Sequence, residues 1–178
     1  KPRNVPTWKA FVLVLIPGCA AHLGGALLYQ GVIEQRLSFD GVGKAYFGAL
    51  AFQMLCFWGL ARLLLSKADL ARAWDRFAIA SAFAYAVMRF GCFASGCCYG
   101  KLCSYPWAVI FKDEHSLTPW LGLPLHPVQL YGVAHGLFVG AILWVLSKRI
   151  RALGADGALI WFFLALLGAG RWITEAYC

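Results

Sequence analysis

The sequence predicts an all-α protein, a bundle of about five transmembrane helices that forms a single domain over residues 1–178. Three observations support this. The chain is 61% hydrophobic and only 13% charged, whereas about a quarter of the residues of a soluble domain are charged. The apolar residues gather into long runs, and the basic residues stand at the ends of these runs. So few charges cannot cover the outside of a water-soluble domain, which excludes that class.

Crossing the hydrocarbon core takes about 20 mostly apolar residues in a helix. The third apolar segment is short unless it takes residues from the arginine-bearing motif that follows it. Between the third and fourth segments lies a long polar connection, from Gly91 to Pro127, in which residues 107–111 are expected at the membrane interface. The five segments that meet or nearly meet the required length are Trp8–Tyr29, Tyr46–Leu65, Phe77–Phe90, Val128–Leu146 and Gly157–Tyr177.

The positions of lysine and arginine predict the orientation, because cytoplasmic loops retain positive charge. The basic residues form no stripe of the kind that binds nucleic acid, so the net charge of +8 indicates membrane topology and contact with anionic lipid. The N-terminus is therefore expected in the cytoplasm, and the connection at about residues 91–127 is expected to be exported. Ten of the 16 basic residues lie on the predicted cytoplasmic side: Lys1, Arg3, Lys9, Arg62, Lys67, Arg72, Arg76, Lys148, Arg149 and Arg151.

Four cysteines in the exported connection follow the pattern Cys-x4-Cys-Cys-x4-Cys, at Cys92, Cys97, Cys98 and Cys103. Zinc sites pair their thiolates two to four residues apart, and adjacent cysteines are not expected to face one tetrahedral metal, so we expect no metal here. One or two structural disulfides suit the oxidising exported side. A thiol relay needs a Cys-x-x-Cys pair, which is absent, and free thiols acting as small apolar side chains remain an alternative.

Glycines and arginines around these cysteines indicate an anion site. Gly91, Gly96 and Gly100 permit a positive φ angle and a close approach of a ligand to the main chain. Arg89 precedes them at the membrane boundary, where an arginine is costly unless paired, and its planar guanidinium suits phosphate. The alternative is an arginine whose side chain reaches the interface and anchors the helix end.

Two further elements lie at the same expected end of the bundle. Arg171 stands inside the last apolar segment, four residues before Glu175 and so on the same helix face. The two charges either satisfy each other as an ion pair or contribute to the anion site. His126 precedes a proline that begins the fourth helix. It is either a capping or interfacial residue, or the group that takes a proton near neutral pH.

Together these elements resemble the prolipoprotein diacylglyceryl transferase family over about residues 45–177. That family has an Arg-x-Gly-Asn-Phe stretch that ends in a bulky residue and Gly, then Pro-Trp-Ala, His-Pro-x-Gln-Leu-Tyr and a late Arg-x-x-x-Glu. The chain matches these elements in order, and the histidine element is the most specific. The matching residues are Arg89-Phe90-Gly91-Cys92-Phe93, Tyr99-Gly100, Pro106-Trp107-Ala108, His126-Pro127-Val128-Gln129-Leu130-Tyr131, and Arg171 with Glu175.

The resemblance implies an enzyme of the bacterial inner membrane that moves a diacylglyceryl group from phosphatidylglycerol to a lipobox cysteine thiol and releases glycerol phosphate. Its implied partners are phosphatidylglycerol or another anionic phospholipid, and a prolipoprotein signal peptide. It implies no cofactor and no metal. The implied catalytic residues are Arg89 and Arg171, which stabilise the phosphate, and His126, which takes the thiol proton. The implied substrate-binding residues are Gly91, Cys92, Gly96, Tyr99, Gly100, Gln129, Tyr131 and Glu175.

The chain departs from the family pattern in several places. Cys92 stands where the family has Asn, Cys97 where it commonly has Glu, and Phe47 where a His or Tyr is usual. The family also has seven spans and a larger outer head. Two alternatives therefore stay open: a non-catalytic relative that serves as a subunit of a larger membrane complex, and a membrane thiol–disulfide protein that uses the Cys97–Cys98 region.

Overall fold

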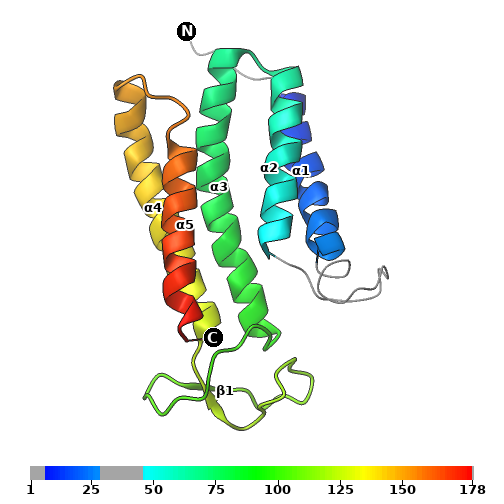
Figure 1. The fold of residues 1–178 in the computed structure, drawn as a ribbon, viewed down its shortest axis with the longest axis vertical. Coiled ribbons are helices and arrows are strands. Elements are labelled where there is room, and N and C mark those ends of the chain that lie inside the picture. Colours follow the sequence, from blue (N-terminus) through cyan, green and yellow to red (C-terminus); the bar gives the residue numbers. More distant parts are fainter. Residues whose placement is uncertain (1–6, 29–45, 178) are drawn as a thin grey trace. The chain divides into compact units, whose positions relative to one another are not determined.

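The computed structural model describes residues 7–28 and 46–177, which are mostly helical. The chain divides into two compact units, Lys1–Leu70 and Ala71–Cys178. Within the described residues each of the five predicted apolar segments forms a helix, while Tyr29, Lys1 and Arg3 lie outside them. The single-domain organisation stays a prediction. The elements in chain order are α1 (Thr7–Leu28), α2 (Tyr46–Leu64), α3 (Lys67–Ala94), β1 (Val109–Ile110), β2 (Pro124–Leu125), α4 (Val128–Ala152) and α5 (Leu159–Glu175) (Figure 1).

The first unit is an antiparallel pair of helices, α1 and α2. Gly24 of α1 lies directly against the ring of Phe52, and a side chain larger than hydrogen has no room there. At the other end of the pair, the Lys9 Nζ donates a hydrogen bond of 2.7 Å to the carbonyl oxygen of Leu64. This bond joins the start of α1 to the end of α2 and occupies one of the carbonyl groups that a helix end leaves without an intrahelical partner.

Helix α3 is longer than predicted at both ends. The sequence predicted Phe77–Phe90, whereas the helix runs from Lys67 to Ala94. Gly91 and Cys92 are therefore helical, and the polar connection begins after Ala94 rather than at Gly91. Hydropathy alone could not show this, because the first turns of α3 carry charged residues that extend the helix beyond its apolar part.

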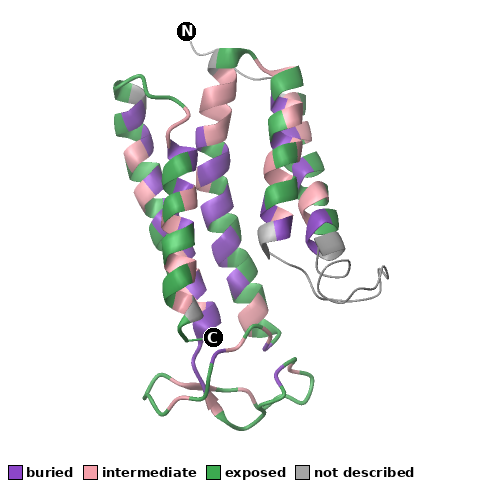
Figure 2. Cartoon of the chain, viewed as in Figure 1, coloured by how far each residue is buried: buried purple, intermediate pink, exposed green. Residues whose placement is uncertain are grey.

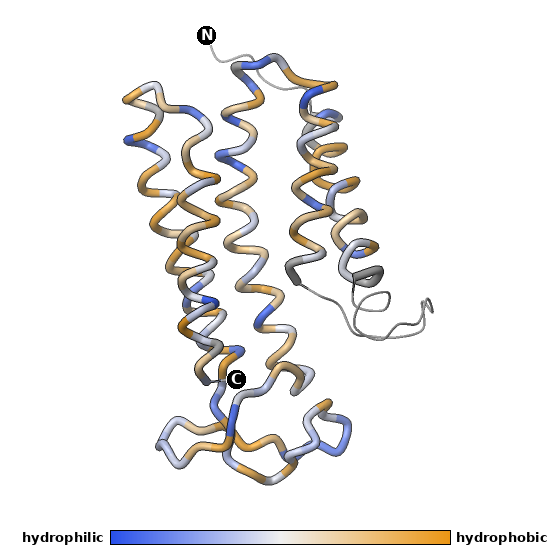
Figure 3. The backbone as a smooth tube through the Cα atoms, viewed as in Figure 1, coloured by the Kyte–Doolittle hydropathy of each residue, from blue (hydrophilic) through white to orange (hydrophobic). Residues whose placement is uncertain are grey.

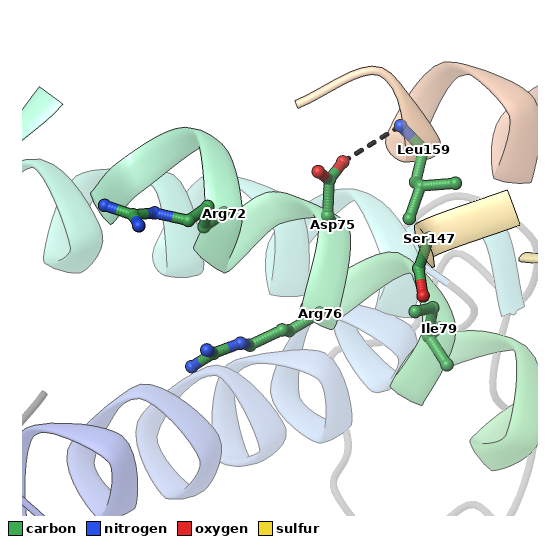
Figure 4. A pocket seen from close by; sticks show the side chains of 6 residues that line it. All are labelled: Arg72, Asp75, Arg76, Ile79, Ser147 and Leu159. Carbon is green, nitrogen blue, oxygen red and sulfur yellow. Dashed lines mark hydrogen bonds between the residues drawn. The ribbon is translucent and has the colours of Figure 1, made fainter. Parts of the chain in front are cut away.

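Buried Asp75 explains how the charged start of α3 is accommodated (Figure 4). Its Oδ1 accepts a hydrogen bond of 2.9 Å from the Leu159 amide, and its Oδ2 accepts one of 2.9 Å from the Gly157 amide. These amides belong to the beginning of α5, where helical N–H groups lack intrahelical partners and a negative charge is favourable. Asp75 therefore fixes the start of α5 against α3.

A row of small residues lets α3 and α4 approach closely. Gly132, Gly136 and Gly140 recur every four residues along one side of α4. A Cβ atom at these positions would lie 2.9 Å from the Arg89 side chain, 3.0 Å from Ala82 and Ala86, and 2.9 Å from the Phe83 ring, respectively. Such spacing of small residues is typical of close helix packing in membranes. The glycine row was present in the sequence but was not used to predict this contact.

The helices expose much of their apolar surface. Among the described residues, two helices are long and apolar enough to cross a membrane, Asp69–Ala94 and Val128–Ile150, and only 33% of the apolar window of each is buried. Figures 2 and 3 show exposed and hydrophobic residues along the same helices. A soluble core helix would be mostly covered, so this pattern favours helices that face lipid. Examples of exposed apolar residues are Val87, Phe138, Trp144, Trp161 and Trp172.

The connection between α3 and α4 contains a small antiparallel sheet. Val109 pairs with Leu125 and Ile110 pairs with Pro124, and Leu102 forms a further bridge to Leu125. The prediction that residues 107–111 only lie at an interface therefore missed a strand, because a two-residue strand has no measurable alternation. Leu125 is almost fully buried, and it brings the next residue, His126, to the start of α4.

Candidate functional site

The site is built where the polar connection meets the start of α4 and the end of α5. The Gly100 amide donates to the His126 carbonyl at 3.2 Å, and the His126 amide donates to the Lys101 carbonyl at 2.9 Å. The Lys101 amide in turn donates to the carbonyl oxygen of Tyr177 at 2.9 Å. These backbone bonds hold three segments that are far apart in the sequence in one place.

Aromatic side chains surround His126. Its Nδ1 lies 3.2 Å from the Tyr131 hydroxyl, and that hydroxyl oxygen accepts a hydrogen bond of 2.9 Å from the Trp107 indole. The rings of Tyr105 and Tyr177 lie 5.6 Å and 5.1 Å from the imidazole, measured between centroids. His126 itself is only 9% exposed, so its imidazole is oriented by partners and largely shielded from water.

Gln129 is fully buried beside the cysteine loop. Its Nε2 donates a hydrogen bond of 2.7 Å to the carbonyl oxygen of Cys97. Its Oε1 has no hydrogen-bond partner within the described part of the chain. A buried oxygen without a partner costs about 1–3 kcal/mol, which a ligand that donates a hydrogen bond would recover.

Arg89 lies on α3, is buried, and is held by the preceding turn. Its Nε donates to the Tyr85 hydroxyl at 3.1 Å, and its guanidinium carbon lies 5.3 Å from the centre of the Tyr85 ring. The aliphatic part of the side chain passes over Gly132, where a Cβ atom would come within 2.9 Å. Among the described side chains, no carboxylate forms an ion pair with Arg89. A buried cation without a carboxylate partner is a candidate anion-binding group.

Three cysteines meet beside this arginine. The sulfur atoms of Cys92, Cys97 and Cys98 all lie within 4.8 Å of one another. Cys98 has a φ angle of +53°, the one positive value at a described residue other than glycine. This strained backbone turns two adjacent side chains toward the same point. The spacing of the cysteines gave no reason to expect three sulfur atoms so close together, and whether they share a metal stays a prediction.

The three thiols and the two arginines are electrostatically linked. Hydrogen bonding with Cys92 and then Cys97, together with the charges of Arg89 and Arg171, lowers the pKa of Cys98 to about 5, although desolvation of the thiolate acts in the opposite direction. Burial, followed by the neighbouring Cys98, raises the pKa of Cys97. Both arginines, 82 residues apart in the sequence, thus act on one sulfur atom. The described cysteines are free thiols, and none of the expected disulfides forms among them.

The structure brings some of the predicted site residues into contact and leaves others apart. Hydrogen bonds join His126 to Gly100 and Tyr131, and join Gln129 to Cys97. Of the three glycines, Gly96 alone has a positive φ angle, +65°, whereas Gly100 is needed for close packing and Gly91 lies in α3 with open space around it. Tyr99 is half-buried without a described role. The side chain of Glu175 lies outside the described part, so its pairing with Arg171 stays a prediction.

Sequence reasoning missed several members of this site. Tyr85 stands four residues before Arg89, the spacing that places two side chains on one helix face, and this signal was available. Cys98 was treated with the other cysteines and was not assigned to the site. Trp107 belongs to the matched Pro-Trp-Ala element but was given no role, although its indole donates to the Tyr131 hydroxyl. Tyr105 and Tyr177 could not be found from the sequence, because only the folded chain brings them to His126.

Comparison with known proteins decides the family. A family model described as prolipoprotein diacylglyceryl transferase matches residues 6–177. The chain belongs to this family. The match includes the cysteine loop, the histidine element and the last helix, so the diacylglyceryl transferase family is also the one that the motifs resemble.

Curated relatives carry the name phosphatidylglycerol–prolipoprotein diacylglyceryl transferase. The protein from Polynucleobacter asymbioticus is 34% identical over 94 residues, which are 52% of this chain and 33% of the relative. The protein from Clostridium tetani is 26% identical over 191 residues, covering 98% of this chain and 70% of the relative. The one from Dehalococcoides mccartyi is 27% identical over 133 residues, 75% of this chain and 49% of the relative. The chain thus spans from a third to 70% of their length. No solved structure matches it.

Proposed function

We propose that this chain transfers a diacylglyceryl group from phosphatidylglycerol to the cysteine thiol of a prolipoprotein in the bacterial inner membrane. Family membership supports the reaction class, and it does not favour the non-catalytic or the thiol–disulfide alternative. In this reaction the thiol sulfur forms a bond to the terminal glyceryl carbon. The bond from that carbon to the phosphate oxygen breaks, its electron pair leaves with the oxygen, and glycerol phosphate is released.

The observation that carries the proposal is buried Arg89, which has no carboxylate partner among the described side chains and whose charge reaches the same point as that of Arg171. The leaving group gains negative charge as its carbon–oxygen bond breaks, so the site must stabilise a phosphate more strongly in the transition state than in the lipid. Guanidinium groups in a poorly hydrated site do this efficiently, and that of Arg89 is already oriented by Tyr85. Phosphatidylglycerol carries the required phosphate at the membrane surface.

Gln129 and Tyr131 are proposed to position the lipid headgroup. The unpaired Oε1 of Gln129 accepts a hydrogen bond from a glycerol hydroxyl, which only a headgroup with free hydroxyls offers. The aromatic rings at His126 supply apolar walls and polar edges at the depth where headgroup and acyl chain meet. From this arrangement we expect a preference for phosphatidylglycerol over phospholipids whose headgroup has no hydrogen-bond donor.

His126 is proposed as the proton acceptor from the thiol. Nε2 can accept a proton only if Nδ1 already carries one, and Nδ1 then donates its hydrogen to the Tyr131 oxygen 3.2 Å away. That oxygen has two lone pairs and also accepts from Trp107. The Trp107–Tyr131–His126 arrangement thus accommodates the tautomer in which Nε2 is basic.

The membrane topology is also proposed: five spans, a cytoplasmic N-terminus, and an exported connection from Ser95 to Pro127. The asymmetry of basic residues and the exposed apolar helices support it. Cysteines introduced at exposed Glu114 and exposed Ser66 should be treated in intact spheroplasts with a membrane-impermeant maleimide, and the modified sites mapped by mass spectrometry. Residue 114 should be modified and residue 66 should not. The reverse result would invert the topology.

A transfer assay tests the proposed function. Purified protein, phosphatidylglycerol vesicles and a lipobox peptide should yield a peptide whose mass has increased by one diacylglyceryl group, together with glycerol phosphate. The His126→Gln variant should be about 100-fold slower, which is a typical contribution of one positioned acid–base group. A peptide with serine in place of cysteine should not react, and His115→Gln, in the exposed loop, should keep the wild-type rate. Absence of transfer by the wild-type protein would refute the proposal.

A further inference from the structure

The cluster of Cys92, Cys97 and Cys98 has the properties of a metal site rather than of three unrelated thiols. Three sulfur atoms bound to one tetrahedral zinc, at bond lengths near 2.3 Å, lie about 3.8 Å apart. The three sulfurs here are all within 4.8 Å of one another, so small side-chain rotations bring them to that spacing. The sequence pattern gave no reason to expect this, because it lacks the usual two- to four-residue spacing between ligands.

The backbone is shaped to hold this arrangement. Cys92 is in the last turn of α3, and the chain turns sharply after it, with positive φ angles at Gly96 and at Cys98. The Cys97 amide donates a hydrogen bond of 3.1 Å back to the Cys92 carbonyl, and the Cys97 carbonyl accepts the bond from Gln129. A positive φ at a cysteine costs free energy. That strain places the thiol of Cys98 beside the other two.

The charge balance also suits a divalent ion. Three thiolates and one Zn²⁺ have a net charge of −1. The charges of Arg89 and Arg171 reach the cluster and offset this charge. Thiolate ligands select thiophilic ions such as zinc over magnesium or calcium. Three close free thiols on the exported side would otherwise be open to oxidation to a disulfide, and bound zinc prevents this.

We propose that Cys92, Cys97 and Cys98 bind one zinc ion through three thiolates, and that its fourth coordination position is open to an incoming thiol. Structural zinc sites have four protein ligands, whereas sites that bind a substrate keep one position free. No fourth cysteine, histidine or carboxylate joins the group within the described residues. Cys98 is exposed, so a ligand from outside can reach the ion.

The assignment of the acceptor thiol to the open coordination position rests on the transferase function proposed above. The acceptor of that reaction is a cysteine thiol, and zinc binds sulfur as thiolate. The acceptor thiol gives its proton to a base, its sulfur occupies the open position, and the sulfur then attacks the glyceryl carbon as the carbon–oxygen bond breaks. Zinc exchanges no electrons in this step. The ion would thus add a second means, beside His126, of presenting the acceptor as a nucleophile.

Metal content gives the first test. The full chain should be purified in detergent without added chelator, and its metal content measured by elemental mass spectrometry. We expect about one zinc ion per chain. Zinc should fall at least about tenfold in Cys92→Ser, Cys97→Ser and Cys98→Ser, and should be retained in Cys103→Ser, because Cys103 is not in the cluster. A wild-type protein without zinc, or with copper or iron in its place, overturns the proposal. So does a disulfide between any two of the three cysteines in the purified protein, or zinc retained in the cluster variants.

Cobalt substitution separates this proposal from the transferase function. With Co²⁺ in place of zinc, the chain should show sulfur-to-cobalt charge-transfer absorption and the intense visible bands of a tetrahedral site. Adding a lipobox peptide should shift the visible bands, and adding its serine counterpart should not. A cobalt spectrum that the thiol peptide leaves unchanged overturns the open position, even if transfer occurs. A peptide-dependent shift without any transfer to the peptide supports the site and refutes the proposed function.

Discussion

Replacing Arg89 by lysine is expected to lower the rate of diacylglyceryl transfer by about 100-fold, comparable with the loss of one preoriented donor to an oxyanion. Lysine keeps the positive charge but cannot hold two phosphate oxygens in one plane. Its single nitrogen must also replace both the Arg89 Nε that bonds the Tyr85 hydroxyl and the terminal nitrogens that face the lipid. Because the effect falls on the transition state, kcat should fall more than the affinity for phosphatidylglycerol.

A matched control is available on the same helix. Arg76 also lies on α3 but is exposed, and Arg76→Lys should stay within about twofold of the wild-type rate, as expected for a surface substitution. The measurement is initial rate against lipid concentration in mixed micelles, with the thermal unfolding temperature recorded for each variant. If Arg89→Lys keeps the wild-type stability and more than about a third of its rate, the phosphate role of Arg89 is wrong.

Replacing Gly100 by alanine is expected to disrupt the site through packing rather than charge. A Cβ atom there would lie 2.6 Å from the Tyr177 carbonyl oxygen, 2.7 Å from Val128 and 2.8 Å from the Cβ of His126. Two of these neighbours are tied to the loop by backbone hydrogen bonds and cannot simply move away. Such overpacking costs about 1–3 kcal/mol of stability. A shift of His126 by about 1 Å would lower the rate of transfer about 100-fold.

Gly168→Ala is the matched control for this substitution. Gly168 lies in α5, and a Cβ atom added there would have no neighbour within 4 Å. Alanine in a helix is also slightly more favourable than glycine. This variant should unfold at the wild-type temperature or above it and keep the wild-type rate. The measurements are thermal unfolding in detergent and the transfer assay. A Gly100→Ala protein with unchanged stability and rate would show that the loop, the start of α4 and the end of α5 are not tightly joined.

The positions of most helices could be predicted from the sequence, because a local property, the apolar segment, determines where a helix lies. A helix in lipid needs a continuous apolar segment, so the bounds of α1, α2 and α5 and the start of α4 could be predicted closely, whereas α4 continues beyond the predicted Leu146 to Ala152. Helix α3 also extends beyond its predicted bounds, and its first turns carry charged residues. Its start is capped by Ser66, whose Oγ accepts a hydrogen bond of 3.3 Å from the Asp69 amide, and the carboxylate of Asp75 accepts bonds from two amides more than 80 residues later in the chain.

The residues of the candidate site could be predicted where a motif holds them close in sequence. Gln129 and Tyr131 lie in the first turn of α4 and His126 stands two residues before that helix, so their proximity follows from their closeness in sequence and from helical geometry. The sequence could not show which side chains from other parts of the chain contact these three residues. The rings of Tyr105 and Tyr177 come from a loop and from the residues after α5, and no pattern joins these positions.

The cysteines show the limit most clearly. The sequence alone determined that Cys92, Cys97 and Cys98 are close along the chain, and their spacing argued against a common centre. Tertiary structure decided otherwise, because the end of α3 and the left-handed backbone at Cys98 turn the three sulfurs toward one point. The fold likewise brings the charges of Arg89, on α3, and Arg171, on α5, to bear on one sulfur. The direction of a side chain depends on backbone angles and on distant contacts, and residue spacing specifies neither.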